Sequence, residues 1–416
     1  MAQHRPIYVS IELEQTNLLV GKLFHHSNKR KVTTSFQYDP SWLNHPERFA
    51  IDPALLMTGG TFHTNEDQKL FGAIGDSAPD CWGRILMMRA ESSRSSKMNV
   101  TPRTLTEIDY LLGVNDEVRQ GALRFSYEKG GPYQTPKGQH SIPPLMSLPK
   151  LLSATDRYLE DQETDQDLKM LLAPGSSLGG ARPKASVKDQ NGQLCIAKLP
   201  KNSDTHDVVL WEAVALTLAK DAGIRVCDFF LHTVNDRPVL IIKRFDRVEN
   251  KRLPFLSAMS LLGAKDNEPH SYLDIASAIT QYGASPNEDM EELWKRSVFD
   301  MMISNVDNHL RNHGFLYARF KGWRLSPAYD LNPTPIEKRA RHFATSIDTN
   351  HGLPSVKLAL DIAPLFRVEP NQARRLIEEI INAVKGWKKV AKGVGLNQKS
   401  IKKMGTAFAQ HDVRAC

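Results

Sequence analysis

Apolar and polar residues alternate with a period of two over most of residues 7–38, which predicts β-strands with one buried face. The strands expected from this pattern are residues 7–13, 18–24 and 32–38. Polar turns at residues 14–17 and 26–29 separate them, and such short connections favour antiparallel neighbours. The start of the chain is therefore predicted to be a small antiparallel meander.

A helical pattern first appears near residue 78. Asp76 or Ser77 can accept hydrogen bonds from the first turn of a helix, and Pro79 suits a first-turn position. We therefore predict a helix that begins near residue 78. Further along, residues 128–150 are rich in glycine and proline, which favours a linker.

Helices and strands are mixed through the rest of the chain. The elements expected from apolar periodicity are helices at residues 105–112, 148–159, 208–222 and 294–303, a helix-like segment at 167–172, and strands at 120–126, 185–188, 194–199, 229–234 and 239–243. Asn191-Gly192 lies between two of these strands, and Asn-Gly is a strong signal for a hairpin turn. This mixture predicts an α+β fold.

The most informative stretch is residues 304–330. The polar segment Ser-Asn-Val-Asp-Asn-His-Leu-Arg-Asn-His, at residues 304–313, follows an amphipathic helix. Residues 314–329 have the pattern of a β-hairpin, which returns the chain. Asp330 is therefore expected to lie beside Asp307.

Asp307 and Asn312 have the D-x-x-x-x-N spacing of a kinase catalytic loop. Phosphoryl transfer needs little covalent chemistry from the protein: one carboxylate orients the attacking hydroxyl, while an amide oxygen and a second carboxylate hold Mg²⁺ on the phosphates. Asp307, Asn312 and Asp330 would supply these three groups. The alternative is that Asp307 and Asn312 are ordinary turn and capping residues, which are common in loops.

A glycine-rich loop at residues 174–184 allows three interpretations. It contains G-x-S-x-G, the nucleophile elbow of α/β hydrolases, with Ser177 as nucleophile, but that elbow requires a preceding strand and a following helix. A Walker A loop is excluded because Gly180 is followed by Ala-Arg where Lys and Ser or Thr are needed.

The third interpretation is a loop that lies over the phosphates of ATP. The backbone N–H groups of Gly179 and Gly180 would face the phosphates, and Arg182 or Lys184 would supply positive potential. Turn glycines without a ligand remain the alternative. The third interpretation is favoured because it agrees with the strand lysine and the helix glutamate that follow the loop.

Two further segments fit a nucleotide site. Lys198 ends a strand and Glu212 lies on the following helix, as in kinases whose strand lysine reaches the α- and β-phosphates. Another strand ends at Lys243 and continues into Arg-Phe-Asp-Arg at residues 244–247, which would be the hinge that receives adenine. Lys243 and Phe245 are therefore candidate nucleotide contacts.

Composition excludes several classes of protein. The chain has 416 residues, of which 41% are apolar, and a mean hydropathy of −0.40, so it can bury a large core in two or three domains. No stretch approaches the roughly 18 apolar residues of a membrane span, and the polar start is not a signal peptide. The four cysteines have no C-x-x-C spacing and predict neither a zinc site nor a disulfide framework. A reducing cytoplasm fits best.

The positive charge is concentrated near the end of the chain. The formal net charge is +7, and residues 336–416 hold 15 Lys or Arg and 7 Asp or Glu, a surplus of 8. Such a region would attract polyanions, nucleic acid above all, although a solvated helix face explains it equally well.

Several of these segments together resemble the HipA toxin kinases of bacterial type II toxin-antitoxin systems. The matching pieces, in the order of that family, are Gly75–Arg84, Gly121–Phe125, Ser177–Lys184, Ala197–Pro200, Lys243–Arg247, Asn305–Asn312 and Tyr329–Asp330. Each piece alone is weak, but the combination is highly specific.

The resemblance implies an atypical two-lobed protein-kinase-like fold. Its parts would be an N-terminal β-rich subdomain (1–127), a linker (128–150), a kinase N-lobe (151–250) and a mostly helical C-lobe (251–416) that carries the catalytic loop and the basic region. The site residues implied are Asp307 as catalytic base, Asn312 and Asp330 as Mg²⁺ ligands, Lys198 as the ATP-phosphate lysine, His309 as a neighbour of the nucleotide and Ser177 as a regulatory autophosphorylation site.

The resemblance also implies partners. These are ATP and Mg²⁺, a HipB-like helix-turn-helix antitoxin, operator DNA through the antitoxin complex, and a protein substrate such as an aminoacyl-tRNA synthetase, with growth arrest as the outcome. Two rival functions remain. One is a small-molecule phosphotransferase of the aminoglycoside-kinase type, which is disfavoured because Ser-Asn-Val precedes Asp307 where that class has His-Gly. The other is a non-catalytic subunit of a DNA-bound repressor complex.

Overall fold

The chain divides into two compact units in a computed structural model that describes residues 5–28, 31–65, 67–135, 142–172, 180–266, 268–335, 343–349 and 355–408. Unit 1 comprises Met1–Asn202 and Thr233–Leu256, and unit 2 comprises Ser203–His232 and Ser257–Cys416. The chain passes from one unit to the other between Asn202 and Ser203, within strand β8 (Phe229–Val234) and within strand β12 (Phe255–Ser257). The four-part domain scheme that the resemblance implies stays a prediction.

Unit 1 begins with the predicted meander. Its sheet has the strand order β4-β3-β2-β1-β5. The strands are β1 (Ile7–Leu13), β2 (Thr16–Asn28), β3 (Lys31–Tyr38), β4 (Phe62–His63) and β5 (Leu123–Ser126). Gly21 of β2 has no room for a side chain, because a Cβ there would lie 2.2 Å from the carbonyl oxygen of Gln37 and 2.6 Å from the ring of Phe36. The sheet packs this closely around buried Val9, Val20 and Phe36.

Unit 1 contains both short and long helices. They are α1 (Pro40–Leu43), α2 (Gly72–Gly75), α3 (Cys81–Lys97), α4 (Glu107–Leu112), α5 (Leu148–Leu159) and α6 (Asp165–Leu172), with 3₁₀ turns η1 (Asp116–Val118) and η2 (Leu145–Ser147). The predicted start near residue 78 is wrong: α3 begins at Cys81, and its cap is Asp80, which accepts from the N–H of Gly83 at 2.8 Å. Asp76 and Ser77 are not caps of α3 because Asp76 ends α2 and the Ser77 hydroxyl donates back to Ala73.

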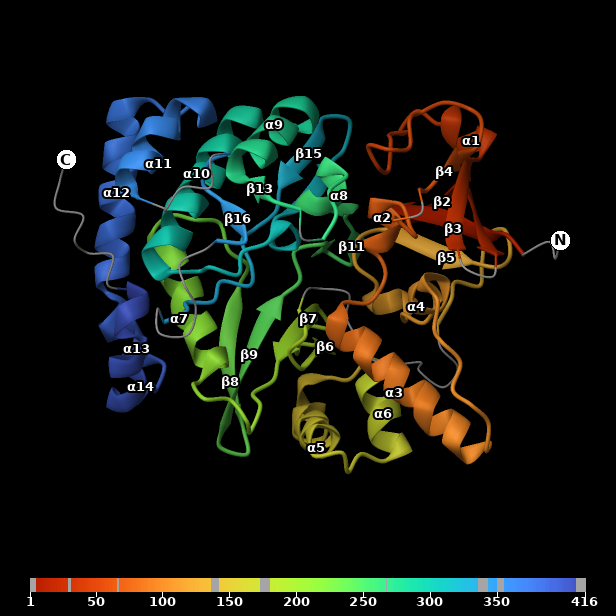
Figure 1. The fold of residues 1–416 in the computed structure, drawn as a ribbon, viewed down its shortest axis with the longest axis horizontal. Helices are drawn as coiled ribbons and strands as arrows, with labels where there is room; N and C mark the ends of the chain where they lie inside the picture. The colour runs from red at the N-terminus through yellow and green to blue at the C-terminus, as the bar shows by residue number, and fades with distance from the viewer. Residues whose placement is uncertain are drawn as a thin grey trace. The chain divides into compact units, whose positions relative to one another are not determined.

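A second sheet, of which β6, β7 and β9 belong to unit 1, has the order β6-β7-β9-β8. Its other strands are β6 (Lys184–Lys188), β7 (Leu194–Lys198) and β9 (Arg237–Lys243). β6 and β7 are the predicted antiparallel hairpin, in register with Val187 opposite Cys195. Trp82 of α3, Leu151 of α5 and Leu171 of α6 share one buried cluster with this sheet, so the three helices cover it (Figure 1).

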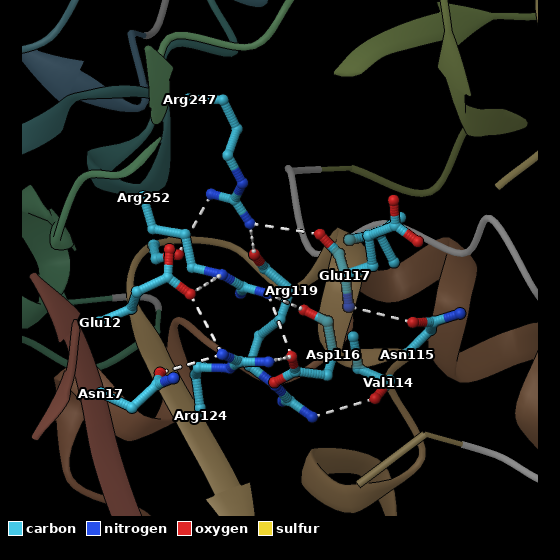
Figure 2. A network of polar contacts seen from close by, with 12 residues as sticks. Glu12, Asn17, Val114, Asn115, Asp116, Glu117, Arg119, Arg124, Arg247 and Arg252 are labelled. Carbon is cyan, nitrogen blue, oxygen red and sulfur yellow. Dashed lines mark hydrogen bonds and ion pairs between the residues drawn. The ribbon is translucent and has the colours of Figure 1, made fainter. Parts of the chain in front are cut away.

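Arginines and carboxylates join separate segments of unit 1 (Figure 2). Asp116 of η1 accepts from Arg124 of β5 at 2.5 Å and from Arg252 of strand β11 (Lys251–Arg252) at 3.1 Å. Strand β10 (Arg247–Val248) pairs with β11, and the guanidinium of Arg247 donates to the carbonyl oxygen of Arg119 at 2.6 Å. The network ties residues 244–252 to η1 and to the N-terminal sheet.

Unit 2 is mostly helical. Its helices are α7 (Val208–Asp221), α8 (Ala258–Leu262), α9 (Tyr272–Tyr282), α10 (Pro286–Ile303), α11 (Val356–Ile362), α12 (Pro370–Lys385), α13 (Trp387–Gly393) and α14 (Gln398–Met404), with 3₁₀ turns η3 (Leu310–Asn312), η4 (Ala363–Phe366) and η5 (Gly405–Phe408). Its short strands are β13 (His270–Ser271), β14 (Gly314–Ala318), β15 (Gly322–Leu325) and β16 (Thr345–Ser346).

The core of unit 2 surrounds α10. This helix packs against α9, α11, α12 and η4, and its residues from Leu293 to Ile303 are buried except Lys295. Because α10 is enclosed on several sides, its C-terminal end at Ile303 is a rigid base for the loop that follows.

The C-terminal helices α12, α13 and α14, drawn in blue in Figure 1, include most of the basic residues of the region 336–416. Their lysines are exposed: Lys385, Lys388, Lys389, Lys392, Lys399, Lys402 and Lys403.

Within the described part of the chain, no helix has the length and apolar character of a membrane span. A β-rich N-terminal region followed by a helical C-terminal region confirms the α+β fold class.

Candidate active site

The loop at residues 304–313 begins where α10 ends in a left-handed residue. Ser304 has a φ of 53°, and the N–H of Asn305 donates to the carbonyl oxygen of Asp300 at 2.9 Å. The loop then closes on itself. The N–H of His309 donates to the carbonyl oxygen of Asp307 at 2.9 Å, and the N–H of Asn312 donates to the carbonyl oxygen of His309 at 2.8 Å. These bonds bring Asn312 back towards Asp307. The side-chain amide of Asn312 donates to the backbone carbonyl oxygen of Asp307 at 3.4 Å.

The predicted hairpin follows this loop and returns the chain along it. β14 and β15 pair in antiparallel register, with Phe315 opposite Leu325. The Tyr329 hydroxyl then donates to the carbonyl oxygen of Arg311 at 2.7 Å. The N–H of Thr334 donates to the carbonyl oxygen of Ser304 at 3.2 Å. The segment that contains Asp330 is therefore hydrogen-bonded at both ends to residues of the loop.

The three predicted groups differ in their surroundings. Asp307 is exposed, Asp330 is half-buried with a φ of 58°, and Asn312 is buried. The side-chain oxygen of Asn312 has no hydrogen-bond partner in the described part of the molecule. A buried amide oxygen without a donor is costly unless something else binds it. Together with the Asp330 carboxylate it fits Mg²⁺, which takes one or two protein oxygens beside substrate phosphates.

A small cavity lies beside Asn312. Its lining is formed by Ile224, Arg296, Phe299, Asp300, Asn308, Asn312, His313, Ala328, Tyr329 and Leu331. Burial lowers the pKa of His313 to about 3, with the positive charge of Arg296 adding to the effect, so the imidazole is neutral at pH 7. Burial raises the pKa of Asp300 to about 6 despite hydrogen bonds to the carboxylate.

His309 is half-buried and its Nδ1 has no hydrogen-bond partner among the described residues. His309 and His313 do not form a zinc site with acids nearby, since no group of three or more His, Cys, Asp or Glu suited to a metal occurs in the described ranges. The role of His309 as a neighbour of the nucleotide stays a prediction.

The glycine-rich loop is described only from Gly180 onwards, and Ser177 and Gly179 lie outside the described residues. Lys184 is buried, and its ammonium group contacts Asp80 at 2.5 Å and donates to the carbonyl oxygen of Gly180 at 2.9 Å. The end of the loop is thereby attached to the start of α3. Because α6 precedes the loop and β6 follows it, the strand–turn–helix of a hydrolase elbow is not present here.

The strand lysine and the hinge belong to unit 1. Lys198 is the last residue of β7 and lies opposite Leu240 of β9. Lys243 ends β9 opposite Cys195, and the Phe245 ring lies 6.0 Å from that of Phe255. Glu212 is buried on α7 of unit 2. The pairing of Lys198 with Glu212, and the nucleotide contacts of Lys198, Lys243 and Phe245, stay predictions.

Comparisons with known proteins identify the family. The model of the HipA-like C-terminal domain matches residues 176–387, just over half of the chain, and the chain belongs to this family. The fold agrees: a chain of the Shewanella oneidensis MR-1 toxin-antitoxin complex of HipA, HipB and operator DNA superposes with a TM-score of 0.66 at 15% identity, covering 97% of this chain and 95% of that one.

Two relatives are named as kinases. Y4mE of Sinorhizobium fredii (strain NBRC 101917 / NGR234), whose name describes it as a candidate kinase, is 22% identical over 325 residues, which is 72% of each chain. The serine/threonine-protein kinase CtkA of Helicobacter pylori (strain J99 / ATCC 700824) is 26% identical over 169 residues, 38% of this chain and 52% of CtkA. Kinase activity is thus supported at the level of the family.

The polar residues that hold the loop on its buried side were not predicted from the sequence. Asp300, Asn305 and Asn308 are buried and hydrogen-bonded to one another, together with Tyr272 of α9. One signal was present: an aspartate occurs in the otherwise apolar run Val-Phe-Asp-Met-Met-Ile at residues 298–303. A carboxylate in such a run has to find hydrogen-bond donors within the core.

Proposed function

We propose that this protein is an ATP- and Mg²⁺-dependent serine/threonine protein kinase that acts as the toxin of a HipA-type toxin-antitoxin system. The observation that carries the proposal is the assembly in unit 2 of Asp307 and Asn312 on one closed loop, with the segment of Asp330 hydrogen-bonded along it. The unpartnered oxygen of Asn312 supports it further.

In the proposed reaction Asp307 orients the substrate hydroxyl and accepts its proton as the hydroxyl oxygen attacks the γ-phosphorus of ATP. ADP leaves as the bond from the γ-phosphorus to the bridging oxygen breaks. Asn312 and Asp330 would hold Mg²⁺, which when bound neutralises charge on the phosphates. Lys198 would contact the α- and β-phosphates, and Gly180 would belong to the loop over them.

The partners of the proposed toxin come from the family. The related structure contains HipA, HipB and operator DNA. We extend this to a helix-turn-helix antitoxin that neutralises the present chain and links it to its operator. The protein substrate would be an aminoacyl-tRNA synthetase, whose phosphorylation arrests growth, and the site of action would be the cytoplasm.

Ser177 would be the self-inactivation site. A phosphate there would add about −1.5 to −2 charges to a loop that is proposed to receive the phosphates of ATP. Repulsion between like charges would expel the loop from that position and block nucleotide binding.

The proposal is tested by substituting the catalytic acid. Asp307→Asn keeps the size of the side chain but removes the base, and should lower phosphotransfer from radiolabelled ATP by about 10²- to 10⁴-fold. Asp361→Asn is the matched control, because Asp361 is an exposed acid on α11 of the same unit and should retain full activity. Equal activity of Asp307→Asn and wild type would refute the assigned role.

A further inference from the structure

Asp300 is a buried carboxylate at the end of α10 that the proposed chemistry does not use. It is 1% exposed and, within the described part of the chain, accepts three hydrogen bonds from side chains. The Tyr272 hydroxyl donates at 2.6 Å, the amide of Asn305 donates at 2.8 Å to the other carboxylate oxygen, and the amide of Asn308 donates to the same oxygen as Tyr272. Two of these three donors belong to the loop at residues 304–313.

Asp300 is connected to both acids of the candidate site, to Asp307 through the chain and to Asp330 through hydrogen bonds. Asn308, which Asp300 holds, is the neighbour of Asp307 in the chain. The side-chain oxygen of Asn305 accepts from the N–H of Asn332 at 3.1 Å, and the Asn332 amide donates to the carboxylate of Asp330 at 3.1 Å. The Asp300 carboxylate is therefore linked to Asp307 through one residue, Asn308. It is linked to Asp330 through two residues, Asn305 and Asn332.

Asp300 is the hub of these connections, and the negative charge of its carboxylate suits that position. A carboxylate only accepts hydrogen bonds, whereas an amide in its place would present two N–H donors towards other donors. The positive charge of Arg296 acts on Asp300 electrostatically, but its guanidinium group is hydrogen-bonded to Glu292 and to the carbonyl oxygen of Ser326. Asp300 therefore directs its lone pairs at the loop amides and the tyrosine instead of at an arginine.

We propose that Asp300, acting through Asn305, Asn308 and Asn332, is a positioning residue that sets the places of Asp307 and Asp330. This inference rests on the proposed kinase function for its catalytic consequence, but not for its structural one. The hydrogen bonds from Asn305 and Asn308 to Asp300 join the loop to α10 and involve no nucleotide. A displacement of about 1 Å at a reacting group can cost about 10²-fold in rate, which sets the size of the expected effect.

One branch leads from Asp300 through Asn308 to Asp307, and the other leads through Asn305 and Asn332 to Asp330. Each branch can be tested with its own variant. Tyr272→Phe removes one donor to Asp300 on the Asp307 branch, and Asn332→Ala removes the donor to Asp330. Asp300→Asn disturbs both branches at nearly constant volume. Ser277→Ala is the matched control, because Ser277 is exposed on α9 and donates only to the backbone of Leu273.

The first measurement needs no activity. Hydrogen exchange of the nucleotide-free protein should be faster in Asp300→Asn at residues 304–313 and 329–334 by about tenfold or more, with α12 unchanged. Asn332→Ala should affect residues 329–334 alone. Unchanged exchange at both segments in a folded Asp300→Asn protein would overturn the inference, even if the protein is a kinase.

The second measurement separates the branches by kinetics. Asp300→Asn should lower kcat about 10- to 100-fold and also raise the Mg²⁺ concentration for half-maximal rate. Asn332→Ala should mainly raise that Mg²⁺ concentration, whereas Tyr272→Phe should mainly lower kcat. Uniform loss in all three variants, with no split between kcat and Mg²⁺ dependence, would indicate a merely structural role. Inactive wild-type protein would instead refute the proposed function and leave the exchange result to decide the positioning role.

Discussion

Asp246 in unit 1 and Asp300 in unit 2 are both fully buried aspartates, but their partners differ. Asp246 binds the guanidinium groups of Arg244 and Arg247, at 2.6 and 2.8 Å, and the N–H of Gly121 at 2.8 Å. These arginines hold the pKa of its carboxyl well below the usual range, although burial acts in the opposite direction. Among the described residues, the direct hydrogen-bond partners of Asp300 are the neutral donors Tyr272, Asn305 and Asn308, and burial raises its pKa to about 6.

The difference matches what each region does. Around Asp246, charged groups fix segments that are far apart in the sequence, as Figure 2 shows for the neighbouring arginines of the same network. Around Asp300, neutral hydrogen bonds aim individual side chains of a loop. Paired charges suit a permanent joint, whereas a carboxylate with amide and hydroxyl donors suits the orientation of functional groups.

The largest effect on stability is expected at the charged joint. Asp246→Asn leaves Arg244 and Arg247 buried without their counter-charge, and removing one partner of a buried ion pair typically costs about 3–5 kcal/mol. The measurement is urea unfolding at pH 7. Asp300→Asn should cost less in the same assay, about 1–3 kcal/mol, because its partners are neutral. Equal losses at the two positions would remove the basis of the comparison.

The pH dependence of stability should distinguish the two acids. The pKa of Asp300 is raised in the folded state, so the folded protein binds this proton more tightly than the unfolded chain does. Its favourable contribution is complete below pH about 4 and is lost as the pH rises through about 6, a change of about 3 kcal/mol. The pKa of Asp246 is lowered, so its contribution is constant above pH 4 and is lost only on further acidification.

Urea unfolding at pH 4.5, 5.5 and 7.5 measures this difference. The stability of wild type relative to Asp300→Asn should decline across that range, while its stability relative to Asp246→Asn should stay level. A level difference for Asp300→Asn would show that its carboxyl titrates normally in the folded protein.

Much of the fold could be predicted because it depends on local patterns. The helix at 148–159 and the strand at 229–234 occur with the predicted bounds, and the hairpin after the candidate catalytic loop is present. The start of α3 was misplaced because Asp76, Ser77 and Asp80 are all competent caps. Only the three-dimensional structure shows that α2 uses the first two.

The candidate site could be predicted only in part. The spacing of Asp307 and Asn312 and the return of the chain to Asp330 are local features that sequence reveals. The hub is not local: Tyr272 lies 28 residues before Asp300 in the chain, and nothing in its own neighbourhood indicates that its hydroxyl meets a carboxylate. The ion pair of Lys184 with Asp80, 104 positions apart, escaped prediction for the same reason.

The smallest effect on stability is expected at an exposed ion pair between an aspartate and an arginine. Arg311 of the candidate loop and Asp266 form an ion pair with side chains that are 46% and 65% exposed. Water screens this pair on all open sides, so Asp266→Asn should change the unfolding free energy by only about 0–1 kcal/mol, and less in 0.5 M NaCl than at low salt. Urea unfolding at the two salt concentrations measures it. A loss of several kcal/mol would mean that ion pairing itself, and not burial, makes Asp246 a strong joint.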